Sequence, residues 1–217
     1  MILVPVKNLV NAKLRLSSVL SPEERQELAQ AMCEDVLGTL AGWRGRPEVA
    51  VVTSDPFAMD AAAYFGFQTI RDDSNPGETG AIEMATALCR SRGEGSTLVI
   101  PADIPLMEAA ELQKIQDAAP PAGAVLVPDA ARRGTNAVLR SPADLFPLHF
   151  GNDSFLPHLA AAQATELPCV VLKLPGIALD VDRPADLREL AAASGERRSQ
   201  KLVRSWNLGA REQACHG

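Results

Sequence analysis

Short apolar runs rich in branched side chains alternate along this chain with longer segments in which apolar residues recur every three or four positions. Runs of the first kind are typical of strands buried on both faces, and the second spacing is typical of amphipathic helices. The pattern predicts strands near residues 1–7, 49–53, 67–70, 97–100, 125–128, 137–139 and 170–174, with helices starting near residues 22, 56, 81, 109, 155 and 184. Such alternation predicts a single α/β domain with a mixed, mostly parallel sheet between helices.

The composition agrees with one domain of ordinary size. The chain has 217 residues, of which 47% are hydrophobic and 22% charged. No apolar run approaches the roughly 20 residues that a membrane helix needs. The N-terminal apolar run is too short for a secretion signal and lacks a basic region before it, so we expect a cytoplasmic protein that does not enter a membrane.

Charge and cysteine content exclude two further classes. The formal net charge of -6 disfavours nonspecific nucleic-acid binding, so an anionic substrate would need a local basic cluster. The four cysteines show no metal-ligand or redox spacing, and free thiols are expected. They are Cys33, Cys89, Cys169 and Cys215.

The predicted strand at residues 97–100 ends at a lone carboxylate, Asp103, held between Pro101 and Pro105. Ligands of open α/β sheets lie at the carboxyl ends of the strands. Proline restricts both its own backbone and that of the preceding residue, which would hold Asp103 in one orientation, as suits a metal ligand. The alternative is that Asp103 caps the helix beginning near residue 108.

The loop after the first strand carries Lys7, Lys13 and Arg15 within nine residues. These cations can bind a triphosphate. Their position supports that function, because α/β proteins often hold phosphates just after the first strand. A solvated loop is the alternative. The turn-rich segment 71–80 places Gly80 just before another helix, whose N-terminus can hold a base or an anion.

Two later segments combine polar groups suited to anions. Residues 132–139 bring two arginines, a glycine turn, Thr135 and Asn136 to the start of a strand. Residues 150–158 join Gly151 to a helix start that exposes backbone N–H groups and the Ser154 hydroxyl. His158 lies one turn further on, where it can face the same site or be a packed core residue.

A second pair of acids, Asp180 and Asp182, precedes the helix that starts near Pro184. Strand-like alternation would put both on one side of the backbone. Together with Asp103 they can form an oxygen site for a hard cation that also takes substrate phosphates. The alternative is that Asp182 caps the following helix.

The segment from residue 195 to 217 is basic and also carries apolar residues such as Leu202, Val203 and Trp206. We divide the chain into a domain at 1–194 and a C-terminal helical tail at 195–217. The tail is expected to pack on the domain or on a second subunit, and a homodimer is predicted.

Several of these segments, taken in order, resemble the CofC/FbiD guanylyltransferases. The resemblance runs from residue 1 to about 190 and rests on Pro5-Val6-Lys7, Ala12-Lys13-Leu14-Arg15-Leu16, Pro101-Ala102-Asp103-Ile104-Pro105, Gly134-Thr135-Asn136, the segment 150–158 and the segment 180–187. It implies a Rossmann-like nucleotidyltransferase fold. It also implies a GTP-dependent enzyme that guanylylates a phosphorylated three-carbon acid in coenzyme F420 biosynthesis, with release of pyrophosphate.

The resemblance assigns roles to individual residues. Asp103 and Asp182, with Asp180, match magnesium-binding acids, and Lys7, Lys13 and Arg15 match the nucleotide loop. From its place before a helix we add Gly80 to the nucleotide side. The catalytic candidates are Lys13, Arg15 and Asp103. Thr135, Gly151 and Ser154 match contacts to the acceptor acid, and we add Asn136 and His158, which lie in the same two segments, to the acceptor side. The implied cofactor is Mg²⁺, and the implied partners are GTP and a small phosphorylated acid.

Two segments depart from the family pattern. Leu14 stands where a serine is usual, and the segment 78–83, Glu-Thr-Gly-Ala-Ile-Glu, stands where Gly-Leu-Asn is usual. Because Glu78 and Thr79 add polar groups there, we favour 3-phospho-D-glycerate as acceptor over phosphoenolpyruvate and 2-phospho-L-lactate. A molybdopterin-type or sugar-phosphate nucleotidyltransferase and a non-catalytic nucleotide-binding protein are the rival functions.

Overall fold

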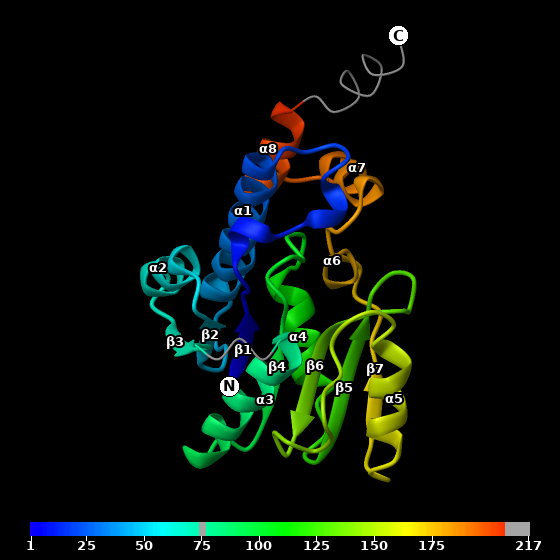
Figure 1. Ribbon diagram of the computed structural model, residues 1–217. Helices are drawn as coiled ribbons and strands as arrows, with labels where there is room; N and C mark the ends of the chain where they lie inside the picture. The colour runs from blue at the N-terminus through cyan, green and yellow to red at the C-terminus, as the bar shows by residue number, and fades with distance from the viewer. Residues whose placement is uncertain (74–76, 207–217) are drawn as a thin grey trace.

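The computed structural model describes residues 1–73 and 77–206 (Figure 1). Its strands are β1 (Ile2–Pro5), β2 (Val49–Thr53), β3 (Gln68–Arg71), β4 (Thr97–Val99), β5 (Gly123–Pro128), β6 (Thr135–Ser141) and β7 (Cys169–Val171). Its α-helices are α1 (Pro22–Gly42), α2 (Pro56–Tyr64), α3 (Gly77–Ser91), α4 (Ala109–Asp117), α5 (Phe155–Gln163), α6 (Pro175–Ala178), α7 (Pro184–Ala192) and α8 (Arg198–Ser205). Two 3-10 turns, η1 (Leu9–Asn11) and η2 (Leu14–Leu16), follow β1.

The described strands form one sheet in the order β3-β2-β1-β4-β6-β5-β7. Strand β6 is antiparallel to both β4 and β5, and the remaining pairs are parallel. The prediction of a mixed, mostly parallel sheet is therefore confirmed. Because β6 is reversed, its first residues lie at the same edge as the carboxyl ends of β1 and β4.

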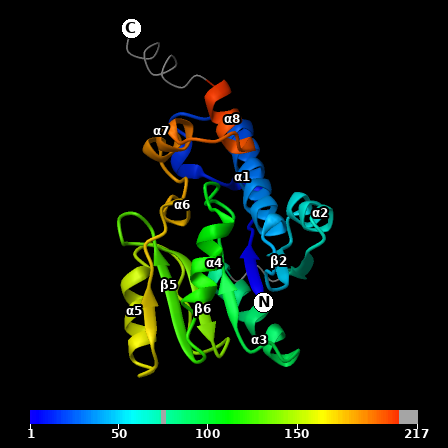
Figure 2. The same ribbon diagram turned by 180° about the vertical axis from the view of Figure 1, so that it is seen from behind.

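Helices cover both faces of the sheet (Figures 1 and 2). Alternation along β1 sends Val4 to a core shared with α1, α2, α4 and α6, and Leu3 to a core shared with α3 and α5. The strands are apolar on both sides for this reason: each face of the sheet is buried under helices.

A third apolar cluster joins the start of the chain to its later helices. Leu16 and Leu28, from η2 and α1, pack with Leu187 of α7 and Val203 of α8. Helix α8 thus packs against the domain between α1 and α7 (Figure 1). Residues 207–217 of the predicted tail, including Cys215, lie outside the described residues, whereas Cys33, Cys89 and Cys169 are free thiols.

The structure differs from the sequence prediction at two elements. The strand expected at 170–174 ends at Val171, and helix α6 follows it; four residues are too few to show a helical period. Helix α3 begins at Gly77, four residues earlier than expected, so Gly80 lies inside the helix. In the ranges 1–73 and 77–206, no helix is long and apolar enough to cross a membrane.

Asp35 of α1 fastens helix α8 to the domain. Its carboxylate accepts hydrogen bonds from the backbone N–H groups of Arg198 and Ser199 at 3.0 and 2.9 Å and from the Ser199 hydroxyl at 2.6 Å. The first N–H groups of a helix have no partner within the helix, so this carboxylate caps α8 from another element.

We expect Asp35→Ala to lower the free energy of unfolding by about 2–3 kcal/mol, because three donors, two of them in buried hydrogen bonds, lose a charged acceptor. Urea denaturation measures the change. The neighbouring Glu34→Gln removes only the ion pair with the exposed Arg198 guanidinium, at 2.8 Å, and should cost less than about 1 kcal/mol. Equal effects of the two substitutions would contradict the capping role of Asp35.

Candidate active site

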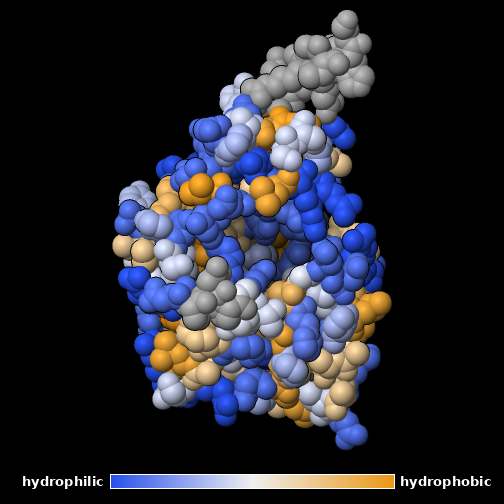
Figure 3. Space-filling model, in the orientation of Figure 1, coloured by the Kyte–Doolittle hydropathy of each residue, from blue (hydrophilic) through white to orange (hydrophobic). Residues whose placement is uncertain are grey.

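Two cavities meet at the edge where β1 and β4 end. The larger has a volume of about 430 Å³ and the smaller about 260 Å³. Glu78, Pro101, Asp103 and Asp182 line both of them. The face of the molecule in Figure 3 is hollowed near its middle, and hydrophilic residues surround the hollow.

Lys13 lies between the two acids at this junction. Its ammonium donates to Asp103 at 2.6 Å and to Asp182 at 2.8 Å, and its side chain is only 8% exposed. Burial disfavours the charged ammonium, yet the two carboxylates outweigh it, so the pKa of Lys13 is raised. Burial likewise opposes ionisation of Asp182, but Lys13 and then Arg15 hold its pKa below the ordinary value.

The backbone around this cluster explains how distant residues meet. Lys13 has a left-handed conformation, with φ of 55°, which turns the chain sharply between η1 and η2. The N–H of Val181 donates to the carbonyl of Asp103 at 3.1 Å, which brings the segment before α7 alongside the end of β4. The two acids therefore come from segments joined by a backbone contact.

Neither acid caps a helix with its side chain. Helix α4 starts after Glu108, not after Asp103. At the start of α7 the carboxylate of Asp186 accepts from the N–H groups of Asp182 and Arg183, at 2.9 and 2.7 Å. The capping alternatives considered for Asp103 and Asp182 are thus wrong, and both side chains face the cavities.

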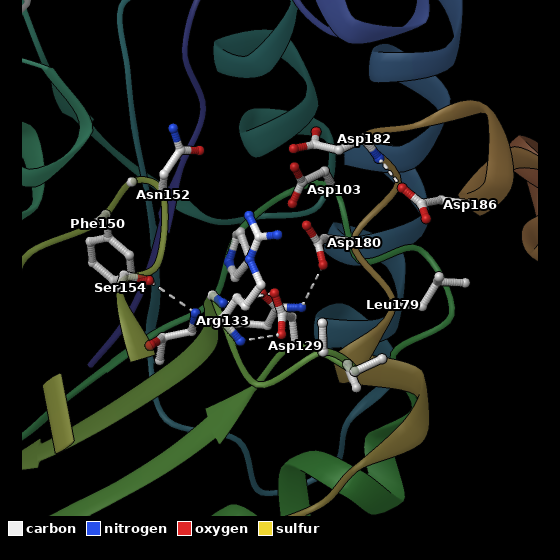
Figure 4. Close-up of a pocket in the computed structure, with 18 of the residues that line it drawn as sticks. Asp103, Asp129, Arg133, Phe150, Asn152, Ser154, Leu179, Asp180, Asp182 and Asp186 are labelled. Atoms are coloured by element: carbon white, nitrogen blue, oxygen red, sulfur yellow. Dashed lines mark hydrogen bonds between the residues drawn. The ribbon is translucent and has the colours of Figure 1, made fainter. Parts of the chain in front are cut away.

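Asp180 points into the same space as Asp103 and Asp182 (Figure 4) but has a different partner. It accepts a hydrogen bond from the Asn136 amide at 3.1 Å, and burial raises its pKa. Asn136 also donates to the carbonyl of Ile177 at 2.9 Å. The segment is irregular, so its two acids reach the cavity without the strand alternation that we expected.

Arg15 connects the acids to the glycine turn that precedes α5. Its guanidinium donates to Asp182 at 3.1 Å and to the Asn152 side chain at 2.8 Å. The side chain is 52% exposed, so it can move towards a bound anion at little cost. Lys7 lines the smaller cavity and donates to Asp72 at 2.8 Å.

The predicted acceptor residues form one wall of the larger cavity. Thr135, Asn136, Gly151 and Ser154 all line it. The Ser154 hydroxyl does not cap α5; it accepts from the N–H of Thr135 at 3.0 Å (Figure 4). His158 and Gly80 line neither cavity, and His158 is fully buried behind the wall.

Acidic residues that were not among the predicted site residues also line the cavities, and Asp129 and Glu78 are two of them. Asp129 lines the larger cavity and accepts from the N–H groups of Arg133 and Gly134 at 2.8 and 2.7 Å, so it shapes the turn before Thr135. An aspartate just after a predicted strand and before a glycine turn was the available signal. Glu78 was noted as a departure from the family pattern that favours 3-phospho-D-glycerate, and it lines both cavities. Burial, followed by the charge of Asp103, raises the pKa of Glu78 to about 7.

The donor set of Asp103 and Asp182 fits a magnesium ion. Their oxygens already hold one cationic atom between them, the Nζ of Lys13. Magnesium is commonly bound through one or two carboxylates, with substrate phosphates and water completing its shell. Among the residues that the structure describes, no group of three or more His, Cys, Asp or Glu side chains is arranged for a metal, so the protein would supply a partial shell.

The fold is shared with nucleotide-transferring enzymes. A nucleotidyl transferase from Methanothermobacter thermautotrophicus superimposes with a TM-score of 0.64 at 16% identity, covering 94% of this chain and 99% of that one. A Desulfovibrio desulfuricans G20 protein assigned as a nucleotide-diphospho-sugar transferase gives a TM-score of 0.79 at 18% identity, covering 97% and 96%. At such identities the likeness shows the fold alone, and the fold class is that of the nucleotidyltransferases.

Sequence similarity shows the family. The family model described as "Guanylyl transferase CofC like" matches residues 1–214, and the chain therefore belongs to the CofC family. The phosphoenolpyruvate guanylyltransferase of Rubrobacter xylanophilus is 38% identical, over 88% of this chain and 93% of that protein. The 3-phospho-D-glycerate guanylyltransferase of Colwellia psychrerythraea is 34% identical (89% and 91%), and the 2-phospho-L-lactate guanylyltransferase of Methanothermobacter thermautotrophicus 33% (87% and 82%).

Proposed function

We propose that this protein is a GTP-dependent guanylyltransferase that joins GMP to a phosphorylated three-carbon acid and releases pyrophosphate. The observation that carries the proposal is the pair of cavities that share Asp103 and Asp182. A transfer between two substrates needs two adjoining sites with charged groups at the point of reaction. The names of the relatives support guanylyl transfer to an acid of this class.

The reaction makes one bond and breaks one. An oxygen of the acceptor phosphate attacks the α-phosphorus of GTP, and the bond from that phosphorus to the oxygen bridging to the β-phosphorus breaks. A phosphate monoester is already largely ionised at neutral pH, because its second pKa is about 6. No general base is needed, and catalysis consists of positioning the reactants and neutralising their charge.

The chain's own residues divide between the two substrates. Lys7 and Lys13 line the smaller cavity, which we assign to the nucleotide. Thr135, Asn136, Gly151 and Ser154 line the larger cavity, which we assign to the acid. Lys13 and Arg15 hold carboxylates in the free protein; each can exchange a carboxylate for a phosphate and counter the charge on departing pyrophosphate.

Asp103 and Asp182, with Asp180 nearby, would hold magnesium. When bound, the ion supplies a positive charge that screens the phosphates from one another. Asp103 and Asp182 are at the junction of the cavities, where they would orient the phosphates of both substrates. Asp180 would be held in place by its hydrogen bond from Asn136.

Pyrophosphate release from GTP tests the function directly. The protein is incubated with GTP and each of the three acids, with and without magnesium, and with CTP in place of GTP as a control. Acid-dependent and magnesium-dependent release from GTP is the expected result. Release only with a molybdopterin or sugar phosphate would support the rival transferases, and nucleotide binding with no release under any condition would support a non-catalytic role.

We expect 3-phospho-D-glycerate to be preferred when the three acids compete at equal concentration. It alone keeps a free hydroxyl after phosphorylation, and Glu78 offers a hydrogen-bonding carboxyl group at the wall of both cavities. The ratio of products, measured by mass spectrometry, should fall towards unity in Glu78→Ala. A preference for phosphoenolpyruvate or 2-phospho-L-lactate in the unmodified protein would contradict this choice and leave guanylyl transfer intact.

The same proposal includes the setting of the enzyme. We propose that it acts in the cytoplasm as a homodimer and serves coenzyme F420 biosynthesis. Analytical ultracentrifugation measures the oligomeric state, and a monomer at micromolar protein concentration would exclude the homodimer.

A further inference from the structure

A buried histidine connects two segments behind the wall of the larger cavity. His158, on α5, is 0% exposed. Its Nε2 atom lies 2.8 Å from the backbone nitrogen of His149, and its Nδ1 atom lies 2.9 Å from the Thr135 hydroxyl oxygen. Thr135 itself lines the cavity, so the imidazole is one residue removed from the space that a substrate would fill.

The contact with His149 settles which ring nitrogen carries the proton. A backbone N–H can only donate, so Nε2 must accept and cannot hold a hydrogen. The neutral ring then has its proton on Nδ1, and burial, reinforced by His149 and Arg140, lowers the pKa of His158 to about 4, which favours the neutral form. Nδ1–H therefore donates to the hydroxyl oxygen of Thr135.

That donation directs the proton of the Thr135 hydroxyl. Its oxygen accepts from His158 through one lone pair, so its own proton points away from the ring and can be donated to another acceptor. The Ser154 hydroxyl is in the same situation, because its oxygen accepts from the Thr135 N–H at 3.0 Å. In residues 1–73 and 77–206 neither hydroxyl donates to a protein acceptor, and both residues line the larger cavity.

We propose that His158 is a positioning residue, which turns the Thr135 hydroxyl into a donor that acts beside the Ser154 hydroxyl on the oxygens of an anion in the larger cavity. The inference rests on the proposed function in one respect, that the anion is the acceptor acid. His158 itself does not touch the substrate. It directs the Thr135 proton away from the ring and so presents Thr135 as a donor, which suits a carboxylate or phosphate because these groups only accept.

Two substitutions of similar size separate this role from packing. Asn at position 158 keeps an amide N–H near the place of Nδ1, whereas Gln keeps an amide oxygen near the place of Nε2. His158→Asn therefore retains the donor to Thr135, and His158→Gln retains only the acceptor for His149. Thr135→Val removes the hydroxyl at nearly constant volume and completes the set.

The measurements are the dissociation constants of the three acids by calorimetry, without nucleotide, and the KM values for acid and GTP. We expect His158→Gln to weaken acid binding about tenfold, the effect of one hydrogen bond, with KM for GTP unchanged. His158→Asn should restore most of the affinity. In the Thr135→Val background, His158→Gln should have no further effect, because the group it positions is gone.

Equal losses in His158→Asn and His158→Gln, or a tenfold loss from His158→Gln that persists in the Thr135→Val background, would overturn the inference, because packing effects are independent of the hydroxyl. Thermal unfolding of each variant shows that it is folded before binding is compared. If the unmodified protein binds an acid but releases no pyrophosphate from GTP, the proposed function fails and the binding comparison still tests His158. If it binds none of the three acids, the inference itself is overturned.

Discussion

Asp103→Asn and Asp182→Asn should each reduce turnover by about 10²–10³-fold, the usual effect of removing one group that stabilises charge in a transition state. Each change removes a negative charge at the junction of the cavities and keeps the side-chain volume. Each also leaves Lys13 with the other carboxylate, at 2.8 or 2.6 Å, so the fold should persist. Pyrophosphate release at saturating GTP and acid measures the effect.

Asp144→Asn is the matched control. Asp144 is a half-exposed aspartate that pairs with Arg90 at 2.6 Å and lines neither cavity. The turnover of Asp144→Asn should therefore be normal. Isothermal titration of magnesium in the presence of GTP gives a second reading, in which both site variants should bind the ion more weakly than Asp144→Asn. Near-normal turnover in both site variants would remove the basis for the metal assignment.

Lys13→Met should reduce kcat/KM for GTP by about 10²–10³-fold as well, since it removes a buried ammonium from the same charge cluster. Lys114→Met, on the exposed side of α4, is the matched control and should be silent. Arg15→Met should have a smaller effect than Lys13→Met, because the Arg15 side chain is 52% exposed whereas that of Lys13 is 8% exposed. Equal activity of Lys13→Met and Lys114→Met would exclude Lys13 from catalysis.

The effect of Lys13→Met on stability should depend on pH. The pKa of Asp182 is lowered in the folded protein, so its contribution is present above its unfolded value, about 4, and is lost as the pH falls through the folded value. The pKa of Lys13 is raised, so its contribution is lost only as the pH rises far above neutrality. Urea denaturation should therefore show the largest difference between Lys13→Met and the unmodified protein near neutral pH and a smaller one at pH 3. A constant difference would contradict the ion-pair account.

The sequence predicted the strands well because both faces of the sheet are buried. A run such as residues 49–52 is apolar throughout, which few other elements require. Asp103 was also predictable, since two prolines and the end of an apolar strand mark its position without reference to any distant residue. Features with a local physical cause could therefore be predicted from the sequence.

Contacts between distant segments could not be predicted from the sequence. The three cations after β1 were expected to bind phosphates. In the fold, Lys13 forms ion pairs with Asp103 and Asp182, and no local sequence pattern encodes that pairing. His158 was assigned to the acceptor site from its position one turn beyond Ser154. The direction in which α5 packs decides which of the two residues faces the cavity, and this depends on the sheet beneath the helix.

The ion pairs of Lys13 span 90 and 169 positions of the chain, to Asp103 and Asp182 respectively. A contact between residues so far apart closes a long loop, and its entropic cost is repaid only after most of the sheet exists. A chain growing from its N-terminus cannot make the second pair until residue 182 has left the ribosome, and all seven strands of the described residues precede that residue. The candidate site is therefore complete only after residue 182 has been made, and a chain stalled before that residue can reach much of the fold while holding Lys13 against a single acid.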